Sequence, residues 1–384
     1  SYPLSLFYDN DIYIEIGLLL SISLFFTTLN IVPNALILKR LEFKKIAIRT
    51  IFVNIGASSL TIILAIYGFG YYAIIINSIV VSLLIFLWNY ISYPIKPLFK
   101  NLLTTYSKIK HFSNYQFAFN IINYFTRHLD NIFIAKYLGN VQLGYYSRSY
   151  QLMKYPISHL THAITPVLHP VLSKYENEQD IIYLKYIKVL KLLSISGVFV
   201  SLVSFFFSKE IIFVLFGSQW EESVIPMKYL SISIWAQMLA SSSGSIFQSL
   251  NKTKKMFTAG VFSTIVIITA ILIGVFYGKS INSVSIAIGV GYNIVWIITF
   301  YFLISRAFNK SFVKFLSNFY VDFLLAVIMV FVTIVINDNM RVDNILLALA
   351  IKTSVTGVAY LILLLIFKQL KHFRILFKGT GGKQ

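Results

Sequence analysis

The chain has 384 residues, of which 57% are hydrophobic and only 12% are charged, and its mean hydropathy is +0.76. This composition excludes an ordinary soluble domain. The net charge of +19 does not indicate nucleic-acid binding, because the basic residues lie in short gaps between apolar runs and no soluble basic domain carries them. Anionic lipids of the cytoplasmic leaflet are the expected counter-charge. Since cysteine is absent, a disulfide framework, a thiolate metal site and a cysteine nucleophile are excluded.

Eleven apolar stretches reach the roughly 20 residues that a helix needs to cross a bilayer. They cover residues 12–38, 46–67, 70–92, 112–138, 141–171, 187–207, 225–250, 257–277, 283–305, 316–336 and 344–367. A closed β-barrel would show short alternating strands instead of these long, unbroken runs. The predicted fold class is therefore an all-α integral membrane protein with about 11 transmembrane helices in this chain.

The gaps between the apolar stretches alternate in charge. Basic gaps surround residues 39–49, 96–110, 252–255 and 306–314, and the tail after residue 367 is basic as well. The intervening gaps are acidic or neutral, as at Asp9 and Asp11. Lysine and arginine are retained on the cytoplasmic side during insertion, so the pattern predicts a cytoplasmic C-terminus. The gap at 174–188 is nearly balanced in charge, but its lysines still permit the same assignment.

A polar linker and a weak internal repeat predict two helical lobes. The linker, around residues 92–113, carries Pro94, Pro97 and four lysines, and we expect it to be a hinge. At an offset of 210 residues, the run at 20–23 matches the run at 230–233. Chance matching in a biased composition remains the alternative. Residues 1–8 read like the end of an apolar segment, so we expect an N-terminally truncated chain.

Two successive predicted spans carry polar stripes. On the fourth span these are Asn114, Asn120, Asn123, Arg127, Asp130 and Asn131, mostly at helical spacing. On the fifth span they are Arg148, Gln151, Lys154, Tyr155, His159, His162 and His169. Ionisable residues inside spans are costly and usually face a cavity or a partner. Two readings stay open: a cationic, water-filled cavity that receives an anionic group, or a structural ion pair between Asp130 and Arg148. Arg127 and Lys154 have no obvious acidic partner in sequence, which favours cavity lining for these two.

The histidines and the search for enzyme motifs give no catalytic assignment. No cysteine or clustered carboxylate accompanies His159, His162 and His169, which disfavours a metal site. His128 beside Asp130 could couple protons to transport, or it could simply be hydrogen-bonded between helices. No phosphate-binding glycine loop and no carboxylate pair on a soluble face is present. The sequence therefore predicts a protein that is not an enzyme and that carries no cofactor or metal.

Four segments carry a resemblance to a known family. They are NYFTRHLDNIFIAKYLGNVQLGYYSRSY at 123–150, QLMKYPISHLTHAITPVLHPVLSKY at 151–175, FGSQW at 216–220 and PNALILKRLEFKK at 33–45. The chain resembles the Wzx-type flippases of O-antigen, capsule and exopolysaccharide units. These belong to the superfamily that also holds lipid II flippases and multidrug exporters. The resemblance implies a fourteen-helix, two-lobed fold of which this chain lacks the first two to three helices.

The resemblance also implies boundaries. Residues 1–92 would complete the N-terminal lobe, 93–111 would be the cytoplasmic linker, 112–305 the six-helix C-terminal lobe, and 306–384 two further helices with a basic tail. The protein would be a multi-pass protein of the bacterial cytoplasmic (inner) membrane. A polysaccharide polymerase and a chain-length regulator are the candidate protein partners.

The substrate implied by the resemblance is an oligosaccharide joined by pyrophosphate to a polyprenyl lipid, moved by alternating access. Arg127, Arg148 and Lys154 would neutralise the diphosphate. Asn120, Asn123, Asn131 and Gln151 would bind sugar or water, and Asp130 and His128 are the ion-pair or coupling candidates. Two alternatives remain: an ion-coupled multidrug exporter of the same superfamily, whose cationic cargo would favour an acidic cavity, and a membrane polymerase or glycosyltransferase.

Overall fold

A computed structural model of the chain describes residues 1–9, 11–40, 42–94, 102–126, 128–162, 168, 172, 175, 178–340 and 342–372. The secondary structure in these ranges is helical, without a strand, in agreement with the predicted all-α class. The chain divides into two compact units, residues 1–103 and 104–384. This division falls inside the segment 93–111 that the sequence predicts to be a linker.

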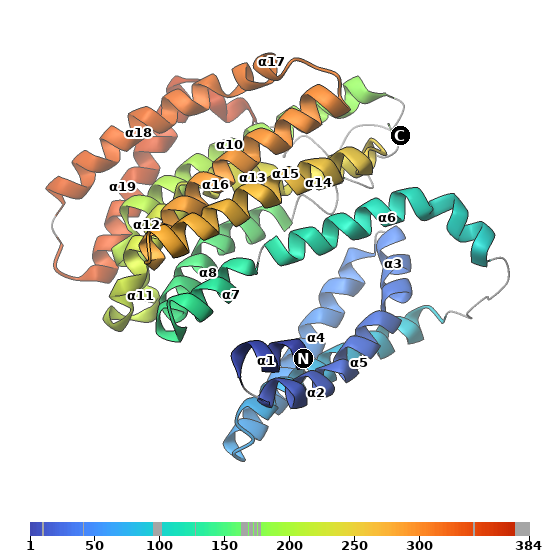
Figure 1. Ribbon diagram of the computed structural model, residues 1–384. Coiled ribbons are helices and arrows are strands. Elements are labelled where there is room, and N and C mark those ends of the chain that lie inside the picture. The colour runs from blue at the N-terminus through green and yellow to red at the C-terminus, as the bar shows by residue number, and fades with distance from the viewer. Residues whose placement is uncertain are drawn as a thin grey trace. The chain divides into compact units, whose positions relative to one another are not determined.

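The first unit packs its long helices around α5. Its helices are α1 (Tyr2–Tyr8), α2 (Ile12–Leu29), α3 (Ile31–Lys39), α4 (Phe43–Ile66) and α5 (Tyr71–Ser92), and both α2 and α4 lie against α5 (Figure 1). The turn between α4 and α5 places Gly68 and Gly70 at positive φ, where a side chain would be strained. It lets α5 return antiparallel to α4.

The second unit contains the remaining helices. They are α6 (Leu102–Thr126, which begins at the unit boundary), α7 (Leu129–Tyr137), α8 (Asn140–His162), α10 (Gln179–Phe206), α11 (Ser208–Phe216), α12 (Val224–Ser231), α13 (Ile234–Ser241), α14 (Ser243–Ser249), α15 (Thr253–Leu272), α16 (Ile281–Tyr301), α17 (Phe312–Leu316), α18 (Tyr320–Asn339) and α19 (Ile345–Ile366). Figure 1 shows α18 and α19 side by side, and α18 also packs against α10. Short π-helical segments, Ile273–Tyr277 and Phe302–Ala307, extend α15 and α16.

Aromatic stacking and close backbone contact hold this second unit together. The ring of Phe300 on α16 stacks on Tyr186 of α10 and on Phe315 of α17, with centroid separations of 6.4 and 5.1 Å. At Gly289 an added Cβ atom would lie 2.7 Å from the carbonyl oxygen of Tyr229, so only glycine lets α16 approach α12 this closely. The central helices are thereby fixed as a frame for the polar side chains described below.

Eight helices in the described part of the chain are long and apolar enough to cross a membrane. They correspond to the predicted spans at 12–38, 46–67, 70–92, 187–207, 257–277, 283–305, 316–336 and 344–367. The other three predicted stretches form different structures. Residues 112–138 divide between α6 and α7, 225–250 fold into three helices of seven or eight residues, and 141–171 begin with the polar helix α8. Hydropathy alone did not reveal these interruptions.

Candidate functional site

The exposed side of α8 carries a connected row of polar side chains. Arg148 is solvent-exposed and donates from Nη1 to Oε1 of Gln151 at 3.2 Å. Gln151 in turn donates from Nε2 to the hydroxyl of Tyr155. The steps of three and four residues place these groups one above another on a single helical face. The structure therefore brings together three members of the predicted stripe.

Arg148 lies over an aromatic platform supplied by the FGSQW segment. Its guanidinium carbon is 5.4 Å from the ring centroid of Phe216 and 5.2 Å from that of Trp220. The Trp220 ring meets Tyr145 edge to face at 5.7 Å, which fixes its orientation. Cation–π contact with the two rings favours this position of the guanidinium, whose planar group has five N–H donors. The segment thus acts as a support for the cation.

Asp130 is buried, and its side-chain partner is Tyr146 of α8. Its side chain accepts a hydrogen bond from the hydroxyl of Tyr146 at 2.8 Å and another from the backbone N–H of Asn131 at 2.8 Å. The ion pair with Arg148, one of the two readings that the sequence leaves open, is not formed in this structure. Tyr146 and Arg148 are two residues apart, so they project from nearly opposite sides of α8, and the tyrosine side is the one that meets α7.

The remaining predicted site residues are dispersed over α6, α7 and α8. Lys154 lies with its Nζ 4.3 Å from the Tyr150 ring centroid. Asn131 is half-buried on α7, and His128 is exposed with its ring 4.7 Å from that of Tyr124. Arg127 lies outside the described residues, so its predicted role stays a prediction.

The two predicted asparagines of α6 differ in their surroundings. Asn120 accepts a hydrogen bond from Gln116 at 3.0 Å, and Gln116 accepts one from Gln248 of α14 at 3.1 Å. Asn123 is half-buried. The chain of amides at Asn120 therefore connects α6 to α14 inside the second unit.

Two buried ion pairs were missed by the sequence reasoning. Lys191 of α10 lies 3.0 Å from Asp322 of α18, with side chains 9% and 1% exposed. Lys352 of α19 lies 2.7 Å from Glu210 of α11, again with both side chains largely buried. The signal was present, because Lys191, Asp322 and Lys352 each stand inside an apolar run. These pairs fasten α18 and α19 to the rest of the unit.

A buried arginine in the first unit was missed as well. Arg49 of α4 is only 6% exposed and donates from Nη1 to Oδ1 of Asn89 at 2.7 Å and to Oδ1 of Asn34 at 3.2 Å. Asn89 donates from Nδ2 to Oδ1 of Asn30 at 2.7 Å. No carboxylate in the ranges described above forms an ion pair with Arg49. Its charge is held by amide oxygens alone.

The described ranges hold no group of three or more histidine, aspartate or glutamate side chains that could together hold a metal ion. His159 is described and lies 6.1 Å from the Tyr155 ring, whereas His169 and the side chain of His162 lie outside the description.

Comparisons with known proteins define the class and then the family. The fold is that of a multi-pass helical membrane protein similar to a solved structure of the lipid II flippase MurJ in an inward closed conformation. The TM-score is 0.63 at 17% sequence identity, covering 86% of this chain and 67% of that one. A family profile described as polysaccharide biosynthesis protein matches residues 1–225. The chain belongs to this family, which confirms the resemblance seen in the segments at 33–45 and 123–220.

The chain is also similar to individual curated proteins. The chain is 25% identical over 250 residues to an uncharacterized membrane protein in the cps region of Klebsiella pneumoniae, covering 64% of this chain and 50% of the relative. It is 24% identical over 211 residues to the lipopolysaccharide biosynthesis protein WzxC of Escherichia coli, covering 54% and 42%. It is 26% identical over 137 residues to the teichuronic acid biosynthesis protein TuaB of Bacillus subtilis, covering 35% and 28%. The matched stretches thus span half or less of these relatives' own lengths.

Proposed function

We propose that the protein moves a polyprenyl-pyrophosphate-linked oligosaccharide across the bacterial cytoplasmic membrane, for the synthesis of a surface polysaccharide. The observation that carries the proposal is Arg148, an exposed guanidinium on an aromatic platform that forms no ion pair with any carboxylate of the described ranges. Membership in the polysaccharide biosynthesis family and a flippase-like fold support the same conclusion.

The chemistry of the row on α8 suits this substrate. A pyrophosphate offers several anionic oxygens, and a guanidinium can donate to two of them in parallel. Gln151 and Tyr155 continue the row with groups that hydrogen-bond neutral oxygens. Lys154, whose Nζ lies over the Tyr150 ring, adds positive charge on the same helix, one to two turns from Arg148. We assign Arg127 the same role as these two cations.

Transport would proceed by alternating access. The substrate would load its sugar and diphosphate from the cytoplasm while its lipid tail remains in the bilayer. Rocking of one lobe against the other would then expose it to the outside. Partners such as a polymerase and a chain-length regulator would act on the delivered unit. The cytoplasmic position of the C-terminus belongs to this proposal.

The test measures on which face of the membrane the lipid-linked saccharide lies. In cells lacking the gene, a membrane-impermeant sugar oxidant should label the saccharide in inverted vesicles and not in right-side-out vesicles. The wild-type gene should restore outward display, whereas an Arg148→Ala variant at equal expression should not. Normal outward display without the gene, in a strain shown to have no second flippase, would overturn the proposal.

A further inference from the structure

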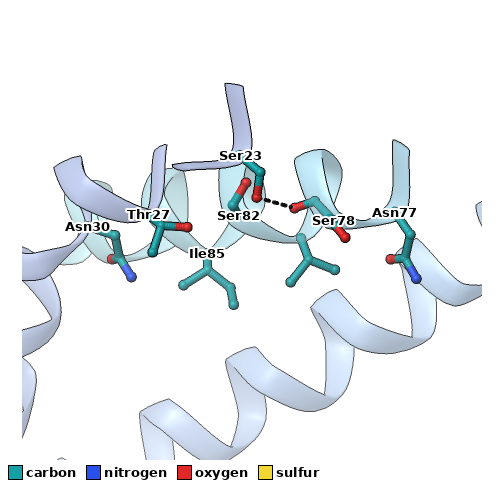
Figure 2. Close-up of a pocket in the computed structure, with 8 residues that line it drawn as sticks. Ser23, Thr27, Asn30, Asn77, Ser78, Ser82 and Ile85 are labelled. Atoms are coloured by element: carbon teal, nitrogen blue, oxygen red, sulfur yellow. Dashed lines mark hydrogen bonds between the residues drawn. The ribbon is translucent and has the colours of Figure 1, made fainter. Parts of the chain in front are cut away.

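The first unit contains a polar groove between α2 and α5 that none of the site residues above occupies. Its volume is about 400 Å³, within the range of small-molecule pockets. Six of its eight lining residues carry hydroxyl or amide side chains, namely Ser23, Thr27, Asn30, Asn77, Ser78 and Ser82. Figure 2 shows them in a row, with Asn30 at one end and Asn77 at the other. None of the lining residues is charged.

Three hydroxyls of the groove, those of Ser23, Ser78 and Ser82, are acceptors. Ser23 donates its proton to the carbonyl of Ser78 across the two helices at 3.1 Å (Figure 2). Ser78 and Ser82 donate theirs to carbonyls of their own helix, at 3.2 and 2.9 Å. A hydroxyl has one proton, so each of these three oxygens retains only lone pairs for a ligand. The side-chain oxygen of Asn77 is buried and has no partner in the described ranges.

Arg49 fixes an amide donor at the Asn30 end of the groove. Its guanidinium donates to Oδ1 of Asn89, which turns the Nδ2 of Asn89 towards Oδ1 of Asn30. The Nδ2 of Asn30 is then directed away from this cluster, and no residue of the described ranges accepts from it. Arg49 is therefore a positioning residue, because it sets the amide orientation of Asn30 through Asn89. The groove presents three serine oxygens as acceptors, and at its Asn30 end an oriented amide donor.

This pattern selects a class of ligand. An anion would be matched by cationic donors, and none of the lining residues is charged. A single metal ion would need oxygens converging on one point, at about 2.5 Å. The seven-residue step from Ser23 to Asn30 spreads these oxygens over about 10 Å. An apolar tail would cover these acceptors without donating to them. A neutral ligand with several hydroxyls at intervals can donate to the three serine oxygens and accept from the Asn30 amide.

We propose that the groove binds the saccharide of the lipid-linked substrate. This inference rests on the proposed function and extends it, because it gives the uncharged sugar its own subsite, separate from the cations of α8. Sugar hydroxyls donate to the oxygens of Ser23, Ser78 and Ser82, and one sugar oxygen accepts from Asn30.

The experiment compares two lipids on the purified chain in nanodiscs. One is the lipid-linked saccharide isolated from the protein's own host cells after deletion of the gene. The other is polyprenyl pyrophosphate of the same chain length without sugar. Wild-type protein should bind the sugar-bearing lipid more tightly. In a Ser78→Ala, Ser82→Ala double variant its Kd should rise about 25-fold, about fivefold for each hydrogen bond lost. The Kd of the sugar-free lipid should stay within twofold.

The matched control is Ser59→Ala on α4, where the hydroxyl also donates to its own helix, at 2.9 Å, but lies outside the groove. It should leave both Kd values unchanged. Retention of the full sugar-dependent gain in the double variant would overturn the groove assignment and leave the proposed function standing. Failure of wild-type protein to bind either lipid would overturn the proposed function.

A second measurement does not depend on loss of affinity. Because the chain has no cysteine, Ser78→Cys introduces a unique thiol. A hydrophilic maleimide should label it, and the sugar-bearing lipid should slow the labelling at least fivefold more than the sugar-free lipid does. Asp343→Cys, in the exposed segment between α18 and α19, should label without protection. Equal labelling of Ser78→Cys with both lipids would contradict the proposal.

Discussion

Removal of the Asp322 carboxylate should destabilise the second unit by about 3–5 kcal/mol, because it leaves the ammonium of Lys191 buried without a counter-charge. The two groups lie 3.0 Å apart, and their side chains are 9% and 1% exposed. Asp322 also accepts a hydrogen bond from Ser194 at 2.6 Å, and Ser194 accepts one from the indole N–H of Trp235 at 2.9 Å. An Asp322→Ala change therefore breaks a network that connects α10, α13 and α18.

The free energy of unfolding is measured by titration with sodium dodecyl sulfate in mixed micelles, followed by tryptophan fluorescence. The control is the exposed pair of Lys209 and Glu221, whose charged atoms lie 3.9 Å apart and whose side chains are 59% and 69% exposed. Glu221→Ala should cost less than about 1 kcal/mol, since solvent screens exposed pairs.

A double variant separates the charge from the packing. Lys191→Met combined with Asp322→Leu should recover most of the stability lost by Asp322→Ala, because apolar residues of similar volume can replace a buried pair at little net cost. The reasoning would be refuted if Asp322→Ala cost no more than the exposed control, or if the double variant were as unstable as the single one.

Three further changes test other parts of the structure. Trp220→Ala should lower export about two- to fivefold through loss of the platform under Arg148, while Trp220→Phe should preserve export; full export in Trp220→Ala would deny the platform a role. Tyr146→Phe should cost about 1–3 kcal/mol in the free energy of unfolding, because Asp130 loses a buried hydrogen bond, and a cost below about 0.5 kcal/mol would contradict that assignment. Lys352→Met should destabilise by about 3 kcal/mol on the same scale, since its carboxylate partner remains buried, and an unchanged unfolding midpoint would contradict this.

The sequence predicted the features that depend on local physics. Long apolar runs with charged gaps gave the helical class and eight of the spans, because bilayer thickness dictates their length. The polar stripe at Arg148 and Gln151 was also predicted, since helical spacing brings residues three apart together.

Contacts between distant segments could not be read from spacing. Asp130 and Arg148 stand at similar depth in a helical hairpin. The side of α8 that meets α7 carries Tyr146, however, so the Tyr146 hydroxyl and not Arg148 donates to the Asp130 carboxylate. Lys191 and Asp322 are 131 residues apart, and only the packing of α10 on α18 makes them partners. The groove of the first unit likewise depends on the parallel register of α2 and α5, which no single segment reveals.

The central claim is that the chain carries a saccharide-linked lipid across a bilayer with the help of an exposed arginine. Its most direct test reconstitutes the protein into proteoliposomes that contain the lipid-linked saccharide, then follows the fraction that an impermeant sugar oxidant can reach. We predict that wild-type protein moves the inner-leaflet saccharide outward, that Arg148→Ala slows this at least tenfold, and that Arg148→Lys lies between them. Equal rates for wild type, Arg148→Ala and protein-free liposomes would contradict the account.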